Sequence, residues 1–137
     1  MAYAIRKFSF FTRQLAGLNE DSRKKVNETI SGMREDAEAR DTVAKTSPQF
    51  DKILSGTGVK KAYVGERILE FEITKRWRIF AYQTDGFDKT FRQPAHPRGK
   101  YKAGPTQTHH FDGQLWLIRI GHLEEGSLID PGNSLLF

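Results

Sequence analysis

The chain has 137 residues, enough for one domain with a modest core, and it contains no cysteine, which excludes disulfides and thiolate chemistry. Its net charge of +5 favours a polyanionic partner over an acidic one. The N-terminus does not resemble a signal peptide, and no stretch approaches the ~20 apolar residues that cross a bilayer. We therefore expect a cytoplasmic protein without a membrane partner.

The N-terminal third predicts a short strand over residues 2–6 and two helices. Apolar side chains at spacings of three and four form one face of the first helix: Phe8, Phe11, Leu15 and Leu18. Asn19 is the predicted N-cap of the second helix, whose apolar stripe runs to Ala37. Joined at Leu18-Asn19, the two helices would form a helical hairpin.

Residues 38–62 are less regular. Ser47-Pro48 has the pattern of an N-cap followed by proline at the first helical position. It predicts a short helix that ends near Leu54, before a loop that contains Gly56 and Gly58.

From residue 62 onward the apolar pattern changes to a period of two, which is typical of strands. We predict a hairpin of strands 69–73 and 77–82 with a two-residue turn at Lys75-Arg76, and a last strand over 115–122. The predicted class is α+β: a single domain, 1–137, in which the helical hairpin packs on a small antiparallel sheet.

A long loop, 87–113, is predicted between the last two strands, because prolines and glycines between residues 94 and 105 disfavour regular structure. Connections of this length are usually functional or disordered. The loop carries five basic and two acidic residues and three of the four histidines. The tail, 123–137, is acidic.

Basic residues concentrate in the predicted sheet and its loop, where residues 60–122 hold 12 basic and six acidic groups. A solvated face is the ordinary interpretation of such charge. The alternative is an RNA-binding surface, with Tyr101 available for base stacking. Its candidate residues are Lys60, Lys61, Arg67, Lys75, Arg76, Arg98, Lys100, Tyr101 and Lys102.

Histidine and arginine together supply the groups that RNA cleavage needs. Histidine transfers protons near neutral pH, and arginine clamps a phosphate and stabilises its developing charge. The 2′-OH would attack the adjacent phosphorus, with no metal or cofactor. Candidate catalytic residues are Arg78, Arg119, His109, His110 and His122.

A metal site is a rival use of the histidines. His96, His109, His110, Asp112 and His122 could supply ligands, but their spacing matches no closed zinc pattern. The sequence also lacks a glycine-rich phosphate loop and a nucleophilic serine in a strained elbow.

The order of elements resembles the RelE/ParE superfamily of bacterial toxins. The closest local match is LEFEITKRWRIFAYQTDG (69–86) followed by LWLIRIGH (115–122), and MAYAIRKFSFFTRQLAGL is similar to a member's N-terminus. The resemblance implies an mRNA endonuclease that acts on ribosome-bound message, inhibits translation and is neutralised by an antitoxin encoded beside it. It matches Arg78 to a phosphate-contacting arginine and His122 to a basic or histidine position after the final glycine.

Four positions depart from the RelE pattern: Leu69 and Phe71 replace lysines, Leu123 replaces an arginine, and Ile129 lies near a tyrosine position. Three interpretations therefore remain open. The first is an endoribonuclease in which the inserted loop supplies cations, the second is a ParE-like toxin that blocks a target such as gyrase without catalysis, and the third is a nucleic-acid-binding protein. In the first, antiparallel pairing would make Arg78 and His122 neighbours.

Overall fold

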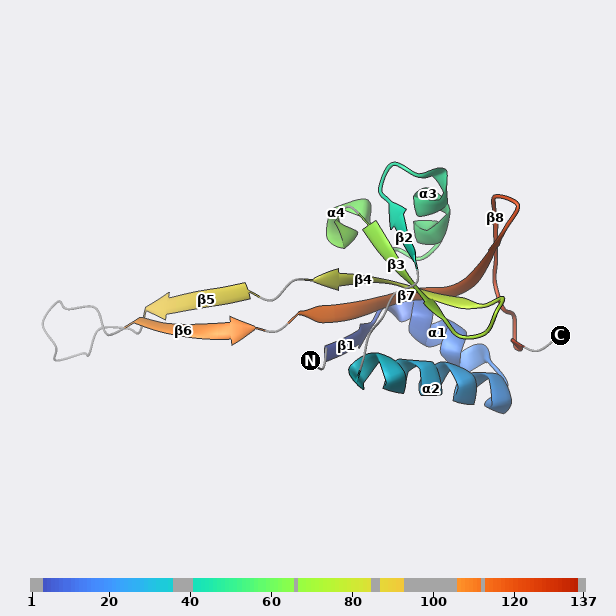
Figure 1. Cartoon of the computed structure of the whole chain (residues 1–137), viewed down its shortest axis with the longest axis horizontal. Coiled ribbons are helices and arrows are strands. Elements are labelled where there is room, and N and C mark those ends of the chain that lie inside the picture. The colour runs from blue at the N-terminus through green and yellow to red at the C-terminus, as the bar shows by residue number, and fades with distance from the viewer. Residues whose placement is uncertain are drawn as a thin grey trace, which may run out of the picture.

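The computed structural model describes residues 4–35, 41–65, 67–84, 87–92, 106–111 and 113–135. Helices and strands combine in an α+β fold, which confirms the predicted class. Figure 1 shows a layered body from which one pair of strands projects. Among the described residues, no helix is long and apolar enough to span a membrane.

The body contains a six-stranded sheet in the order β1-β7-β4-β3-β2, with β8 paired to the far end of β7. The strands are β1 (Ala4–Lys7), β2 (Asp41–Ala44), β3 (Arg67–Glu72), β4 (Arg78–Thr84), β7 (Gln114–Glu124) and β8 (Ser127–Ile129). β1 runs parallel to β7, so the sheet is mixed and the prediction of an antiparallel sheet is wrong. Parallel pairing requires a long connection, and here all the chain between β1 and β7 provides it.

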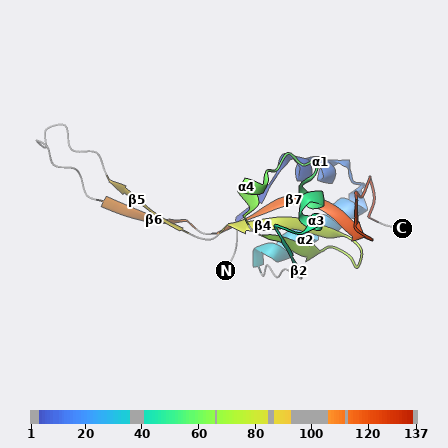
Figure 2. The same ribbon diagram turned by 90° about the horizontal axis from the view of Figure 1, so that it is seen from above.

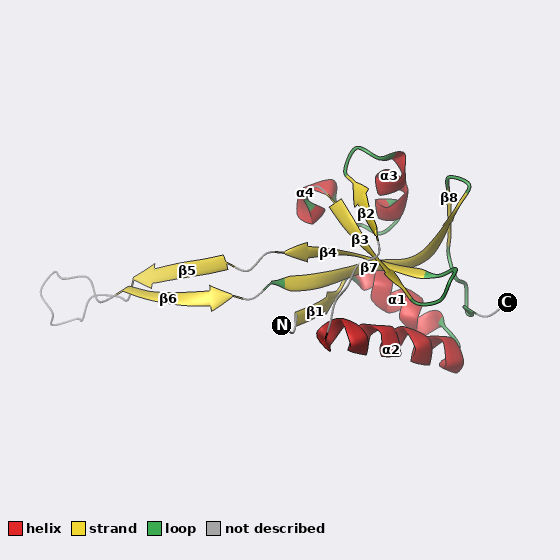
Figure 3. Cartoon of the chain, viewed as in Figure 1, coloured by secondary structure: helices red, strands yellow, loops and turns green. Residues whose placement is uncertain are grey.

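Helices cover both faces of the sheet (Figures 1 and 3). The helices are α1 (Ser9–Gly17), α2 (Glu20–Glu35), α3 (Pro48–Leu54) and α4 (Lys61–Val64). α1 and α2 contribute to one apolar cluster with Ile79 and Leu117, and α3 and α4 contribute to a second cluster with Phe80 and Ile118. We name the two sheet surfaces the α2 face and the α3 face.

Local signals explain where the helices begin and end. Asn19 Oδ1 accepts a hydrogen bond from Ser22 N at 2.9 Å, and Ser47 Oγ accepts one from Gln49 N at 3.2 Å, which confirms both predicted N-caps. Arg23 of α2 donates to the carbonyls of Leu15, Ala16 and Leu18 and so satisfies the C-terminal end of α1.

Three local predictions need correction. β2, α4 and β8 were not expected, and the region after residue 122 is partly strand rather than a tail. The β3–β4 connection is also longer than a two-residue turn at Lys75-Arg76. Ile73 N donates to Trp77 O at 2.9 Å, and Thr74 Oγ1 accepts from Trp77 N at 3.1 Å. This hydroxyl holds the turn without positive φ at Lys75 or Arg76.

The predicted loop over 87–113 contains regular structure, so that prediction is wrong. β5 (Phe87–Arg92) and β6 (Thr106–Phe111) pair antiparallel from Phe87↔Phe111 to Arg92↔Thr106. This pair, which we call the arm, extends away from the end of β4 and β7 in both views (Figures 1 and 2). The prolines and glycines that suggested a loop all lie between the two strands in sequence.

Candidate functional site

The β7–β8 end of the sheet brings together a histidine, a carboxylate and an arginine. His122 and Glu124 are two residues apart on β7, which places them on one side of the strand. His122 Nε2 lies 3.4 Å from Glu124 Oε2, and Arg76 Nη2 lies 3.4 Å from the same oxygen. Glu124 thus contacts two potential cations, and we call these three residues the His122 cluster.

Burial and ring packing fix the orientation of His122. Its side chain is 19% exposed, whereas those of Glu124 and Arg76 are 49% and 46% exposed. The imidazole meets the ring of Trp77 edge-on at 5.9 Å between centroids, and Trp77 itself is buried in the α2-face core. His122 is therefore fixed in orientation, whereas solvent or a ligand can reach Glu124 and Arg76.

Arg78 lies at the same end of the sheet but on its other face. Its Cα pairs with Gly121, so His122, the next residue, points to the opposite side. Arg78 Nε lies 3.5 Å from Glu70 Oε1, and Nη1 lies 3.8 Å from Glu72 Oε1. Nη1 also donates to the carbonyls of Thr74 and Trp77. The expected backbone proximity of Arg78 and His122 is present, but their side chains occupy different faces.

Arg119 is buried on the α3 face. Nη1 donates to the carbonyls of Lys52, Ile53 and Ser55 at the end of α3, and Nη2 lies 2.5 Å from Asp130 Oδ1. Its guanidinium carbon also lies 4.8 Å from the centre of the Phe10 ring. These contacts tie α3 to β7, so a phosphate contact by Arg119 would require breaking them.

The arm histidines are remote from the His122 cluster. His109 and His110 belong to β6, opposite Lys89 and Asp88 in β5, and the structure describes their backbone only. β7 alone extends about 25 Å from Gln114 to His122 at ~3.3 Å per residue, and the arm points away from that end (Figure 1).

The predicted RNA-binding residues divide between the two ends of the sheet. Lys75 and Arg76 lie in the exposed β3–β4 turn near the His122 cluster. Lys60 and Lys61 lie at the start of α4, beside the root of the arm, and Lys61 is paired with Asp51. Only the backbone of Arg67 is described. Four predicted RNA-binding residues and two rival metal ligands lie outside the described residues: Arg98, Lys100, Tyr101, Lys102, His96 and Asp112.

An aromatic cluster at the arm end of the sheet was not predicted. The ring of Phe8 lies 5.1 Å from that of Trp116 and 5.9 Å from that of Tyr82, and the rings of Tyr82 and Trp116 are stacked at 6.3 Å. Burial raises the pKa of the Tyr82 phenol above its ordinary value. Phe80 and Tyr82 alternate on β4, and this pattern could have indicated an aromatic face. Phe8 was missed because it was assigned to the apolar face of the first helix.

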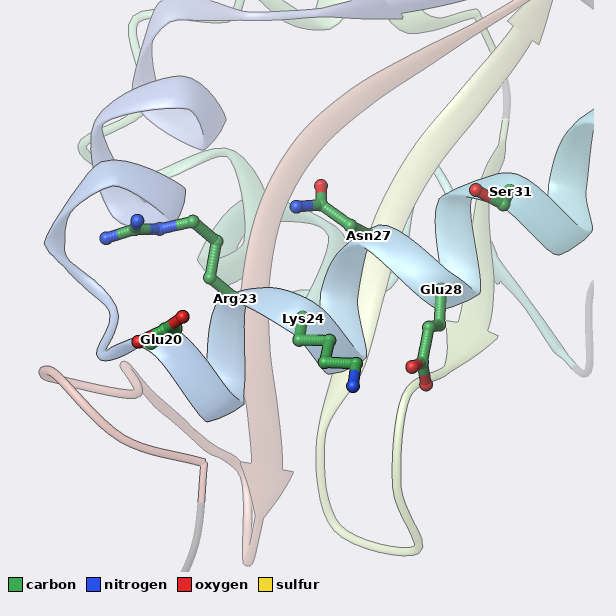
Figure 4. Close-up of a pocket in the computed structure, with 6 residues that line it drawn as sticks. All are labelled: Glu20, Arg23, Lys24, Asn27, Glu28 and Ser31. Atoms are coloured by element: carbon green, nitrogen blue, oxygen red, sulfur yellow. The ribbon is translucent and has the colours of Figure 1, made fainter.

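Two shallow depressions lie on the described surface. One, on the α3 face, is lined by residues that include Lys52, Ser55 and Asp130, around the buried Arg119. The other follows the outer side of α2, where acidic and basic side chains alternate (Figure 4). Among the described residues, no group of three or more His, Cys, Asp or Glu side chains could hold a metal ion.

Comparison with known proteins gives no relative. No protein-family model matches the sequence, and neither the curated proteins nor the solved structures contain a significant match. Functional inference therefore rests on the geometry above and on the sequence pattern.

Proposed function

We propose that this chain is a RelE-like toxin that cleaves RNA in the cytoplasm and is neutralised by an antitoxin protein. The observation that carries the proposal is the His122 cluster, in which one carboxylate oxygen lies 3.4 Å from both His122 and Arg76. A histidine oriented by a carboxylate beside an exposed cation can perform acid–base chemistry on a phosphodiester.

Each residue of the cluster has a distinct task in this reaction. Glu124 at Nε2 favours a proton on that nitrogen and leaves Nδ1 of His122 to accept the proton of the ribose 2′-OH. The 2′-oxygen then bonds to phosphorus, the bond from phosphorus to the 5′-oxygen breaks, and the proton passes to that oxygen. Arg76 contacts the phosphate, whose negative charge competes with Glu124 for the guanidinium.

The order of elements supports the family resemblance. The chain begins with a strand and two helices and, after β2, α3 and α4, continues as a run of strands, β3 to β8, in which Arg78 is the first residue of β4. Arg78 bonds to the Thr74 and Trp77 carbonyls, so it also positions the turn that carries Arg76. For Arg78 to contact a phosphate directly, its guanidinium would have to leave the carboxylates of Glu70 and Glu72 and bind the phosphate instead.

One observation favours the ParE-like alternative, a toxin that blocks a target without catalysis. Arg78 and Arg119, two of the predicted catalytic cations, are both paired with carboxylates of the chain itself. A projecting arm is also a plausible binding element, and a nucleic-acid-binding protein would use the same features. These alternatives predict tight binding without cleavage.

Induced expression distinguishes these functions. Wild-type protein and His122→Gln would be induced to equal soluble levels, and RNA 5′ ends and plasmid supercoiling would be measured together. We expect new 5′ ends within coding regions for wild type only. The same ends in both strains would contradict the role of His122, and intact RNA with altered supercoiling would support the ParE-like alternative.

A further inference from the structure

A row of side chains crosses three neighbouring strands at the arm end of the sheet. Arg6 of β1 pairs in register with Trp116 of β7, and Trp116 pairs with Tyr82 of β4. Residues paired in register point to the same face, so all three lie on the α3 face. Arg6 is exposed, whereas Trp116 and Tyr82 are partly exposed.

The aromatic part of this row is held rigidly. Phe8 N donates to Leu117 O at 2.9 Å, which fixes the Phe8 ring against Trp116. Below, Phe8 and Tyr82 pack on the buried cluster that contains Phe80 and Ile118. A rigid aromatic surface loses little conformational entropy when a flat ligand stacks on it.

Arg6 is a cation on the strand next to Trp116, and Lys60 is a second cation at this end of the sheet. No ion pair involves Arg6 or Lys60 among the described residues, and α4, which begins immediately after Lys60, lies beside this end of β4 (Figures 1 and 2). Val64 of α4 belongs to the same cluster as Tyr82. Tyr63, also on α4, exposes 61% of its surface. Aromatic rings next to unpaired cations are typical of surfaces that bind single-stranded nucleic acid.

We propose that Phe8, Tyr82 and Trp116, with Arg6 at their rim, form a stacking site for an unpaired base of single-stranded RNA. The inference rests on the proposed function, because it assigns a binding site to the RNA that the toxin cleaves. Trp116 stacks on the base, and Arg6 contacts the adjoining phosphate. A duplex, in which both base faces are already stacked, does not fit this site.

The site is separate from the His122 cluster. Trp116 lies about 20 Å from His122 along β7, at ~3.3 Å per residue. A β-bulge between the two residues, where the β4–β7 register shifts at Phe80/Ala81, interrupts the alternation and puts their side chains on opposite faces. A short oligonucleotide therefore occupies one of the two places, and binding at Trp116 can be measured independently of cleavage.

Tryptophan fluorescence tests the proposal directly, because the chain has only two tryptophans and Trp77 is buried. In a Trp77→Phe protein, emission comes from Trp116 alone. A short single-stranded 2′-O-methyl RNA, which lacks the nucleophile for cleavage, should quench this emission, and the matching duplex should not. Binding without quenching, followed by the anisotropy of a labelled oligonucleotide, would overturn the proposal.

Two further variants separate stacking from folding and from charge. Trp116→Leu should weaken oligonucleotide binding about tenfold or more at an unchanged melting temperature, and Trp116→Phe should weaken it less. Arg6→Ala should reduce the salt dependence of binding by about one phosphate contact, and Arg13→Ala, an exposed arginine on α1, should not. Equal salt dependence in both arginine variants would contradict the role of Arg6.

The outcome also distinguishes this site from the cleavage proposal. If 2′-O-methyl RNA quenches the Trp77→Phe protein while the wild-type protein leaves ordinary RNA intact, the stacking site is retained and the endoribonuclease is excluded. Cleavage by the wild-type protein without quenching of the Trp77→Phe protein would retain the endoribonuclease and exclude the stacking site.

Discussion

The body and the arm both contain antiparallel strand pairs, yet different forces hold them. In the body, β4 and β7 lie between two buried clusters, and Ile79, Phe80, Leu117 and Ile118 are fully buried. The arm consists of β5 and β6 alone, and no described residue of the arm belongs to either cluster. A two-stranded hairpin by itself is marginally stable in water.

Because of this difference, substitutions in the two regions affect different properties of the protein. A substitution in the body changes stability and chemistry together, so its effect on activity must be measured per folded molecule. A change in the arm leaves the clusters intact and reports on function alone.

Histidine chemistry should belong to the body and not to the arm. His122→Gln should lower the single-turnover rate of RNA cleavage by about 100-fold or more, because general acid–base catalysis contributes that much. The double variant His109→Ala/His110→Ala should retain cleavage within about tenfold. Rates would be measured between about pH 5.5 and 8, where histidines titrate. Undiminished rates in both variants would exclude histidine chemistry.

Arg119 should be the body residue whose removal costs the most stability. Arg119→Met leaves the carbonyls at the end of α3 without their buried donor, so the free energy of unfolding should fall by about 2–3 kcal/mol. Urea denaturation measures this change. Arg13→Ala, on the exposed side of α1, should change it by less than ~0.5 kcal/mol. A loss below about 1 kcal/mol for Arg119→Met would show that α3 does not depend on this contact.

The sequence predicted the body better than the arm, for physical reasons. β3, β4 and β7 alternate apolar and polar residues because their faces pack on clusters, and capping side chains mark Asn19 and Ser47 as helix starts. β2 was missed because its sequence, DTVA, has a single large apolar residue, Val43, and so shows no alternation over the strand. β5 and β6 were missed because prolines and glycines at 94–105 suggested a loop throughout.

Side-chain direction was the main limit on predicting the site. Antiparallel pairing correctly placed Arg78 next to His122 along the backbone, but a one-residue offset changes the face. The partner of His122 was missed because Glu124 was assigned to a tail. If the last strand had been extended to residue 124, the two-residue spacing would have placed Glu124 on the same side of the strand as His122.

Arg78 offers a test of whether its role is structural or chemical. Arg78→Ala removes the ion pairs with Glu70 and Glu72 and the hydrogen bonds to the turn carbonyls, so we expect a loss of about 1–2 kcal/mol in unfolding free energy, together with loss of toxicity. Glu70→Gln weakens the same ion pair but keeps the guanidinium. If Arg78 grips a phosphate, Glu70→Gln should remain toxic. Equal loss of toxicity per folded molecule in both variants would assign Arg78 to stability alone.

Removal of the arm should have the smallest effect on stability. Thr84 and Gln114 are the last paired residues of β4 and β7, and the Thr84 hydroxyl accepts from Gln114 N at 3.0 Å. An Asn-Gly turn in place of residues 85–113 can therefore close the hairpin with a two-residue type I′ loop. The clusters are untouched and the loop is shorter, so the free energy of unfolding should stay within about 1 kcal/mol of wild type or rise.

Function should respond differently to this truncation. We expect RNA cleavage to be lost, because residues 87–113 carry an excess of three positive charges that would hold the RNA backbone. Quenching of Trp116 should persist, because its cluster belongs to the body. Urea denaturation, single-turnover cleavage and fluorescence on one truncated protein measure all three. Full cleavage would make the arm dispensable, and a stability loss above ~1 kcal/mol would show that the arm supports the body after all.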